Sequence, residues 1–132
     1  MLKTEFLMKN KKPFSISDRF KSFTYAFEGI KTLFQYEHNS RVHLLATISV
    51  IILAILLKVN ILEWIALLIV IGMVFCAEIF NSAIETLCDK ISPQKDEWIK
   101  RAKDLGAAGV LVVSFVALLV GGLIFVPKIL MF

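Results

Sequence analysis

The sequence predicts an all-α integral membrane protein, in which one surface helix precedes three transmembrane helices. The 132 residues are 58% hydrophobic and have a mean hydropathy of +0.76, which is high for a soluble domain of this size. The apolar residues also gather into three blocks with almost no formal charge, at 42–57, 64–77 and 105–126. Since a helix of about 20 apolar residues crosses a bilayer, we expect spans at about 40–58, 62–88 and 103–126.

The part of the chain before the first block is polar and basic. Residues 1–14 are expected to form a flexible leader, and residues 15–132 a single membrane domain. A helix is predicted over about 16–35, because Ser15-Ile-Ser-Asp18 resembles a capping box and bulky apolar residues then recur every three or four positions. These apolar residues are Phe20, Phe23, Phe27, Ile30 and Phe34. We expect an amphipathic helix in the membrane interface, because the short chain offers no soluble core against which it could pack.

The distribution of basic residues predicts the topology. Eight of them precede the first span, Lys58 alone follows it, and five lie between the second and third spans. By the positive-inside rule, the N-terminus and the second loop are cytoplasmic, and the C-terminus is outside. The sequence shows no basic and aromatic surface of the kind that reads nucleic acid, so nucleic acid is not expected as a partner.

The most informative stretch is AEIFNSAIETLCDK, residues 77–90, because it carries carboxylates into the end of the second apolar block. At about 100° per residue, Glu78, Asn81, Glu85 and Asp89 fall on one narrow stripe of a helix. Ionisable groups inside a membrane helix are costly and usually functional. A stripe of carboxylate and amide oxygens suits Mg²⁺ binding or proton transfer.

The cysteines and histidines show no metal-ligand spacing. Cys76 and Cys88 are expected to be two buried free thiols in the second span. His38 and His43 are expected to form hydrogen bonds at the interface rather than to bind a metal.

Segment 89–104 is expected to be the loop between the second and third spans. Lys100, Arg101, Lys103 and Asp104 gather at its end. The cations could bind phosphate oxygens, or they could only set the topology, and the sequence leaves both readings open. The small residues at 106–109 then offer a surface for close helix packing, which favours an oligomer.

From the residues alone, three classes of function stay open. The first is a phosphoryl-transfer enzyme at the membrane surface. The second is a small ion- or proton-handling subunit, but its pathway would need polar residues deeper in the bilayer, where the chain offers little beyond Thr47, Ser49 and Ser114. The third is an assembly protein with a polar zipper, which leaves the lysines opposite the acidic residues unexplained.

Two segments resemble the prokaryotic diacylglycerol kinase family: Glu78-Ile-Phe-Asn81-Ser-Ala-Ile-Glu85 and Ala102-Lys-Asp104-Leu-Gly-Ala-Ala-Gly-Val-Leu111. Phe27-Glu-Gly29 and Glu37 extend the similarity, which covers roughly Phe20 to Pro127. The resemblance implies a homotrimer in the bacterial inner membrane, with active sites shared between neighbouring subunits at the cytoplasmic interface. It implies transfer of the γ-phosphate of ATP, with Mg²⁺, to the hydroxyl of a membrane lipid.

The same resemblance implies roles for individual residues. Glu78 matches the general base of the family, and Glu37 and Glu85 match its metal-binding carboxylates. Positions matching the nucleotide site are Tyr25, Asn81, Glu85, Asp89, Lys103 and Asp104. Gln94, Lys95 and Asp96 fall in the nucleotide loop but differ from the usual residues of the family. Arg19 stands one position away from the family's N-terminal arginine.

The family includes kinases for diacylglycerol and for undecaprenol. Three membrane-edge segments look closer to the undecaprenol kinase branch, which makes undecaprenol the favoured lipid. These segments are Lys58-Val59, Ile61-Leu-Glu-Trp64 and Ile124-Phe-Val-Pro127-Lys-Ile129.

Overall fold

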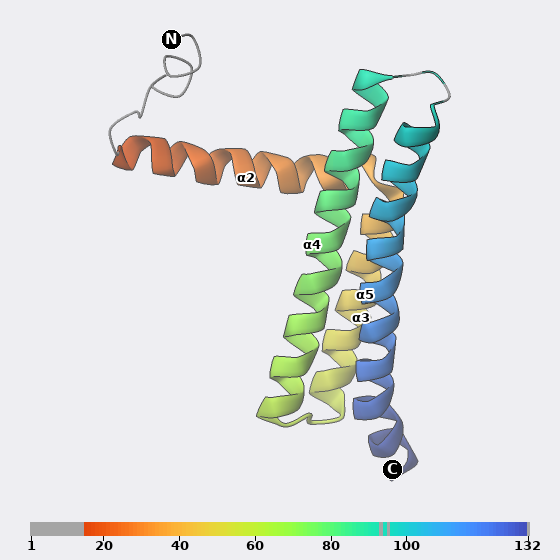
Figure 1. Cartoon of the computed structure of the whole chain (residues 1–132). Coiled ribbons are helices and arrows are strands. Elements are labelled where there is room, and N and C mark those ends of the chain that lie inside the picture. The colour runs from red at the N-terminus through yellow and green to blue at the C-terminus, as the bar shows by residue number, and fades with distance from the viewer. Residues whose placement is uncertain (1–14, 93, 95, 132) are drawn as a thin grey trace, which may run out of the picture. The chain divides into compact units, whose positions relative to one another are not determined.

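The computed structural model describes residues 15–92, 94 and 96–131, and the leader at 1–14 lies outside the described residues. Over the described residues the chain forms four α-helices (Figure 1). They are α2 (Ile16–Tyr36), α3 (His38–Leu56), α4 (Ile61–Ile91) and α5 (Glu97–Leu130). The last three are long and apolar enough to cross a membrane, so the predicted all-α membrane class with three spans is confirmed.

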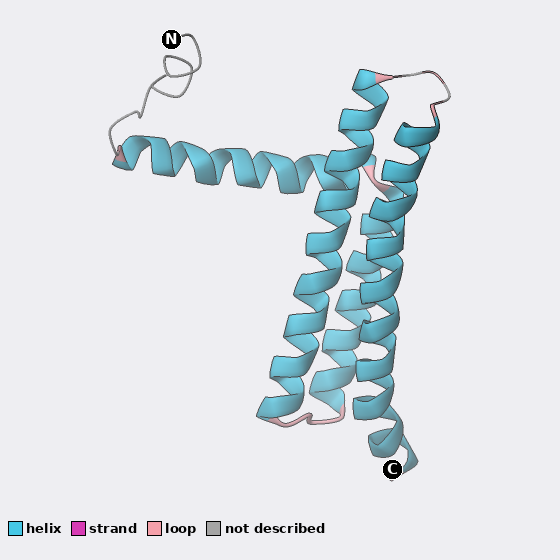
Figure 2. Cartoon of the chain, viewed as in Figure 1, coloured by secondary structure: helices cyan, strands magenta, loops and turns pink. Residues whose placement is uncertain are grey.

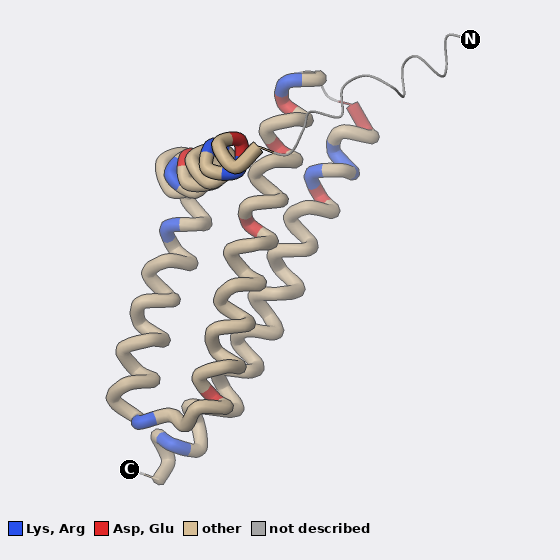
Figure 3. The backbone as a smooth tube through the Cα atoms, turned by 90° about the vertical axis from the view of Figure 1, so that its left-hand side faces the viewer, with Lys and Arg blue, Asp and Glu red and all other residues tan. Residues whose placement is uncertain are grey.

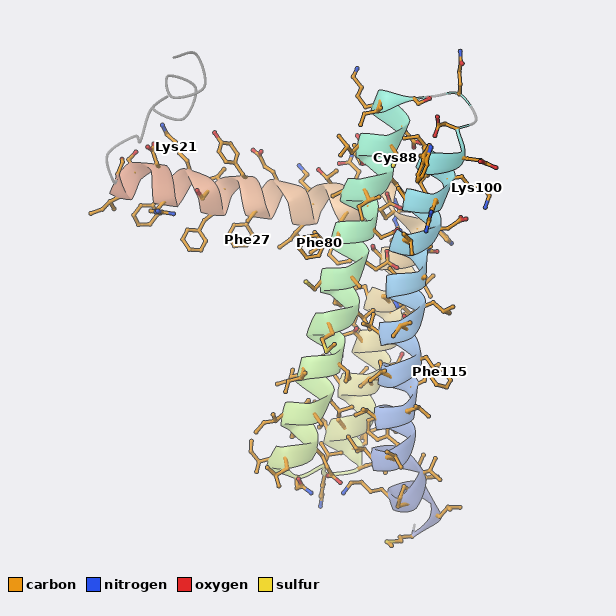
Figure 4. The ribbon with its side chains drawn as sticks, viewed as in Figure 1. Lys21, Phe27, Phe80, Cys88, Lys100 and Phe115 are labelled. Atoms are coloured by element: carbon orange, nitrogen blue, oxygen red, sulfur yellow. The ribbon has the colours of Figure 1, made fainter. Side chains whose placement is uncertain are left out.

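The chain divides into two units, Met1–Lys31 and Thr32–Phe132. In the first unit, the Asp18 backbone N–H donates to Ser15 Oγ at 3.4 Å, as the predicted helix start requires. The labelled side chains of Lys21 and Phe27 leave different sides of α2 (Figure 4), and Phe27 is exposed. Placement of this helix in the membrane interface stays a prediction.

A single residue, Glu37, separates the end of α2 from the start of α3. Its backbone is extended, with φ −95° and ψ 113°. Arg41 closes this break, because its Nε donates to Phe34 O at 2.8 Å and its Nη2 donates to Gln35 O at 2.6 Å. The guanidinium thereby satisfies two carbonyl groups that the end of a helix leaves without partners. Glu37 makes no capping hydrogen bond with its own side chain, so its carboxylate is available to a ligand.

The turn between α3 and α4 is fixed by local hydrogen bonds. Lys58 adopts a left-handed conformation with φ 49°. Asn60 and Glu63 then form a complete capping box at the start of α4. Lys128 Nζ from the end of α5 lies 3.1 Å from Glu63 Oε2. Buried apolar side chains from the three helices and from this turn form a core: Ala54, Val59, Leu67, Ile124 and Phe125.

Helices α4 and α5 pack against each other along most of their length and are joined by a short connection (Figure 2). The predicted loop at 89–104 is therefore too long, since α4 continues to Ile91 and α5 begins at Glu97. The physical reason is an N-cap: Asp96 Oδ1 accepts hydrogen bonds from Trp98 N at 2.8 Å and Ile99 N at 3.1 Å.

The prediction for the cysteines is half right. Cys88 is buried, whereas Cys76 is exposed on the surface of the described chain. Figure 4 shows Cys88 at the same end of the three-helix unit as Lys100, and Phe115 pointing outward from the middle of α5. Figure 3 shows that the charged residues of α3, α4 and α5 gather towards the two ends of the unit, with a long uncharged stretch between them.

Candidate active site

The predicted polar stripe lies on one continuous helix, α4. Exposure rises along it: Glu78 is 2% exposed and Asn81 is 9% exposed, Glu85 is half-buried, and Asp89 is exposed. The stripe therefore runs from a buried carboxylate to the open end of α4, near the α4–α5 connection.

Glu78 is the most deeply buried charged residue of the stripe. Its Oε1 lies 3.1 Å from His43 Nε2, which comes from α3. Glu37 and Glu85 both lie close enough to act on Glu78 electrostatically. A buried carboxylate is costly unless a partner or a function compensates, so the burial of Glu78 beside an imidazole, within electrostatic range of two further carboxylates, indicates a functional site.

Asn81 links the buried part of the stripe to Glu85. Its Nδ2 donates to Glu85 Oε1 at 3.0 Å, which orients that carboxylate. The other amide atom, Oδ1, is buried without a hydrogen-bond partner among the described residues. Oδ1 faces Gly106 on α5, where an added Cβ would collide with it. A side chain at residue 106 would therefore force the Asn81 amide out of its present position.

One lysine of α5, Lys103, pairs with an acidic residue of α4. Lys103 Nζ donates to Asp89 Oδ1 at 2.7 Å, and Glu85 is close enough to Lys103 to act on it electrostatically. Lys100 Nζ donates to Asp104 Oδ2 at 2.6 Å on the exposed side of α5. A cation next to carboxylates at an open helix end is suited to holding phosphate oxygens.

Two further residues predicted for the nucleotide site, Gln94 and Asp96, make local contacts in the α4–α5 connection. The Asp96 side chain caps α5, and Gln94 contributes its backbone oxygen to a 3.5 Å hydrogen bond from Ser92 Oγ. Lys95 lies outside the described residues. Tyr25 and Arg19 belong to the other unit of the chain and are exposed there. The roles expected for these residues stay predictions.

Two residues of the site were missed by sequence reasoning. The sequence predicts a hydrogen bond of His43 at the membrane interface, but no sequence pattern connects His43 with Glu78. Gly106 was recognised only as one of several small residues. Its contact with Asn81 depends on the register of α5 against α4, which a single helical repeat does not fix.

Mg²⁺ fits the residues present. Among the described residues no group of three or more metal-binding side chains is preformed. Mg²⁺ is, however, usually held by one or two carboxylates together with substrate phosphates and water, rather than by an all-protein cage. Glu37, with no capping hydrogen bond, and half-buried Glu85 are each within electrostatic range of Glu78 and are the carboxylates that would hold the ion.

His43 also lines an apolar groove. It has a volume of about 390 Å³ and is lined by residues of α3, α4 and α5. His43, Thr47 and Ser114 are the residues of its lining with polar side chains. The imidazole of His43 therefore contacts Glu78 and also lines the groove.

A helical membrane protein with a buried carboxylate, further acidic residues along the same helix and a lysine on the facing helix has the parts of a membrane phosphotransferase. Residues 24–125 match the family described as prokaryotic diacylglycerol kinase, and the chain belongs to this family. The undecaprenol kinase of Bacillus subtilis is 37% identical over 109 residues, which cover 83% of this chain and 89% of the relative. The diacylglycerol kinase of Escherichia coli K12 is 32% identical over 95 residues, covering 72% and 78% of the two chains.

The diacylglycerol kinase of Synechocystis is 32% identical over 110 residues, which cover 83% of this chain and 63% of the relative. The family and the relatives together make this protein a lipid kinase, a phosphotransferase that acts on an alcohol. The alternative of an ion- or proton-handling subunit is set aside by this result.

Replacing Gly106 with Ala should displace Asn81 and, through it, Glu85. Because misplacement of a catalytic group by about 1 Å can cost on the order of 10²-fold in rate, we expect kcat to fall by roughly that factor. Gly72→Ala is the matched control, since a Cβ at Gly72 on α4 meets nothing within 4 Å. The measurement is the rate of lipid phosphorylation by both variants in the same bilayer. Equal rates for the two variants would show that the Asn81 contact does not matter.

Proposed function

We propose that this protein transfers the γ-phosphate of ATP to the hydroxyl of undecaprenol, with Mg²⁺ bound beside the nucleotide. The observation that carries the proposal is the burial of Glu78 at 2% exposure, with Glu37 and Glu85 within electrostatic range and Lys103 on the facing helix. A buried carboxylate suits proton abstraction, and the outer carboxylates and lysine suit a metal-bound polyphosphate.

In this mechanism Glu78 accepts the proton of the lipid hydroxyl as the hydroxyl oxygen bonds to the γ-phosphorus. The bond between that phosphorus and the β–γ bridging oxygen breaks, and ADP leaves with the electron pair. Asn81 holds Glu85 in place, and Lys103 neutralises phosphate charge at the open end of α4. Mg²⁺, held by Glu37 and Glu85, would neutralise further charge on the nucleotide. Phosphoryl transfer depends mainly on such positioning and charge neutralisation.

The choice of undecaprenol is supported by the Bacillus subtilis relative, which bears that name and matches over 89% of its own length. The membrane-edge segments around Trp64 and Pro127 agree with this choice. The test is to present the purified protein with undecaprenol and diacylglycerol at equal mole fractions in one bilayer. We expect phosphate to enter undecaprenol faster. Faster labelling of diacylglycerol would reverse the lipid assignment without affecting the kinase assignment.

We also propose an inner-membrane location with the N-terminus in the cytoplasm and the C-terminus outside. The support is the asymmetry of basic residues, which places Lys58 alone in the α3–α4 turn. A thiol-reactive probe that cannot cross the membrane should label Lys58→Cys from outside intact cells and should not label Lys90→Cys. The opposite labelling would invert the topology.

We further propose that the enzyme is a homotrimer whose active sites are shared between subunits. The support is the unpartnered surface of α5: Ala107, Ala108 and Gly109 are exposed, and small residues of this kind mark close helix packing in membranes. Within one chain, Glu37 already lies in electrostatic range of Glu78, so sharing is not needed to bring these two together. A site shared between subunits could join Glu37 of one chain with Glu78 of the next, but the contact within one chain makes Arg19 and Tyr25 of the surface helix the residues that we propose one subunit supplies to its neighbour.

Subunits carrying Arg19→Ala and Tyr25→Ala, when mixed with Glu78→Gln subunits, should therefore give more activity than either population alone. The gain arises because an intact surface helix of one chain would serve an intact Glu78 of its neighbour. Exchange is verified with differently tagged subunits, and cross-linking in native membranes should stop at three chains. No gain after verified exchange would place each active site within one subunit.

A further inference from the structure

The contact between His43 and Glu78 joins two helices at the most buried point of the candidate active site. His43 Nε2 lies 3.1 Å from Glu78 Oε1, and the two side chains are 24% and 2% exposed. The other charged groups that act on Glu78 electrostatically are Glu37, which precedes α3, and Glu85 on α4, and both are acidic. His43 is thus the group in contact with Glu78 that can donate a hydrogen bond to it.

The alignment of this contact leaves room for adjustment. Oε1 of Glu78 accepts no well-directed hydrogen bond among the described residues, although Nε2 is within donor distance. Catalytic hydrogen bonds are often poorly aligned in a free enzyme and tighten when substrate binds. A small rotation of the imidazole would direct its N–H at Oε1. The second oxygen, Oε2, would then be left for the lipid hydroxyl.

The surroundings of the ring explain why a donor is needed here. One side of His43 meets Glu78, and the ring also lines the apolar groove between α3, α4 and α5. The Glu78 carboxylate is 2% exposed and so has little solvent to orient it, and Glu37 and Glu85 repel it. An imidazole N–H at this position can hold the carboxylate in one orientation.

We propose that His43 is a positioning residue that holds the Glu78 carboxylate in the orientation required to accept the proton of the lipid hydroxyl. The proposal rests on the assignment of Glu78 as the general base in the proposed function. His43 does not exchange a proton in this role. It donates Nε2–H to Oε1 throughout the reaction, while the proton from the lipid hydroxyl passes to Oε2.

Three single variants test the role. His43→Leu removes the donor, and we expect kcat to fall about 10- to 100-fold, the effect of losing a hydrogen bond to a charged group. The KM values for ATP and lipid should stay within about twofold, because the contact acts on Glu78 and not on ground-state binding. His43→Gln should recover most of the loss, since its side-chain amide can place an N–H near the position of Nε2. His38→Leu is the matched control at the other histidine, and its kcat should equal that of the wild type.

The decisive comparison is a double-mutant cycle with Glu78→Gln. If His43 acts through Glu78, His43→Leu should cost almost nothing further in the Glu78→Gln background, because residues acting as a unit are non-additive. Full additivity, or no recovery in His43→Gln, would overturn the proposal. If His43→Leu fails to fold, the role of His43 is tested by comparing the kcat of His43→Gln with that of His43→Asn. The shorter Asn amide cannot reach Oε1, so His43→Asn should be the slower variant. Equal kcat for those two variants would overturn the proposal.

Failure of this inference is distinguishable from failure of the proposed function. Wild-type activity of the Glu78→Gln variant would show that Glu78 is not the general base, and the inference about His43 would then lose its basis. An impaired Glu78→Gln variant together with unimpaired His43 variants would remove only the inference.

Discussion

Glu78→Gln should reduce kcat by roughly 10² to 10⁴, the range typical for loss of a general base. The substitution is nearly isosteric and removes the charge without opening a cavity, so the fold should persist. Binding of ATP should change little, because the groups proposed to hold the nucleotide lie further along α4 and on α5. The measurement is steady-state lipid phosphorylation, with nucleotide binding determined separately on the same preparation.

Glu63→Gln provides the matched control for this result. It makes the same change in the same helix, at the opposite end, where Glu63 pairs with Lys128 and caps α4. We expect it to lower stability slightly through the weakened cap and to leave kcat unchanged. Equal activity of Glu78→Gln and Glu63→Gln would show that Glu78 takes no part in the reaction.

Glu85→Gln and Glu37→Gln should each raise the Mg²⁺ concentration for half-maximal activity. Loss of one carboxylate ligand leaves the ion held mainly by the nucleotide, and we expect a shift of at least about 10- to 100-fold. The check is a Mg²⁺ titration of activity at fixed ATP for each variant and for the wild type. Unchanged midpoints in both variants would show that neither carboxylate is a ligand, even if kcat falls.

The fold class could be predicted because the strongest signal in a membrane protein is local. Three uncharged blocks were enough to find α3, α4 and α5, since a bilayer forces every backbone polar group into a helix. The shared face of Glu78, Asn81 and Glu85 followed equally directly from the helical repeat. The hydrogen bond from Asn81 to Glu85, one turn further along, is the local consequence of that spacing.

Contacts between helices could not be predicted in the same way. The meeting of His43 with Glu78, and of Gly106 with Asn81, depends on how far one helix is shifted and rotated against another. The exposure of Cys76 has the same cause, because hydropathy does not tell which face of a membrane helix meets protein. The predicted loop at 89–104 is too long because a cluster of charged residues has the composition of a loop. One N-cap residue, Asp96, is enough to start α5 within this segment.

The measurement that tests the central claim most directly is a single-turnover experiment with labelled ATP in bilayers that contain undecaprenol and Mg²⁺. With label in the γ-phosphate, the wild-type protein should transfer it to the lipid. With label in the α-phosphate, the lipid should stay unlabelled. The Glu78→Gln variant should bind γ-labelled ATP but transfer the labelled phosphate at roughly 1% of the wild-type rate or less. Transfer by Glu78→Gln at the wild-type rate, or label in the lipid from α-labelled ATP, would contradict γ-phosphoryl transfer at this carboxylate.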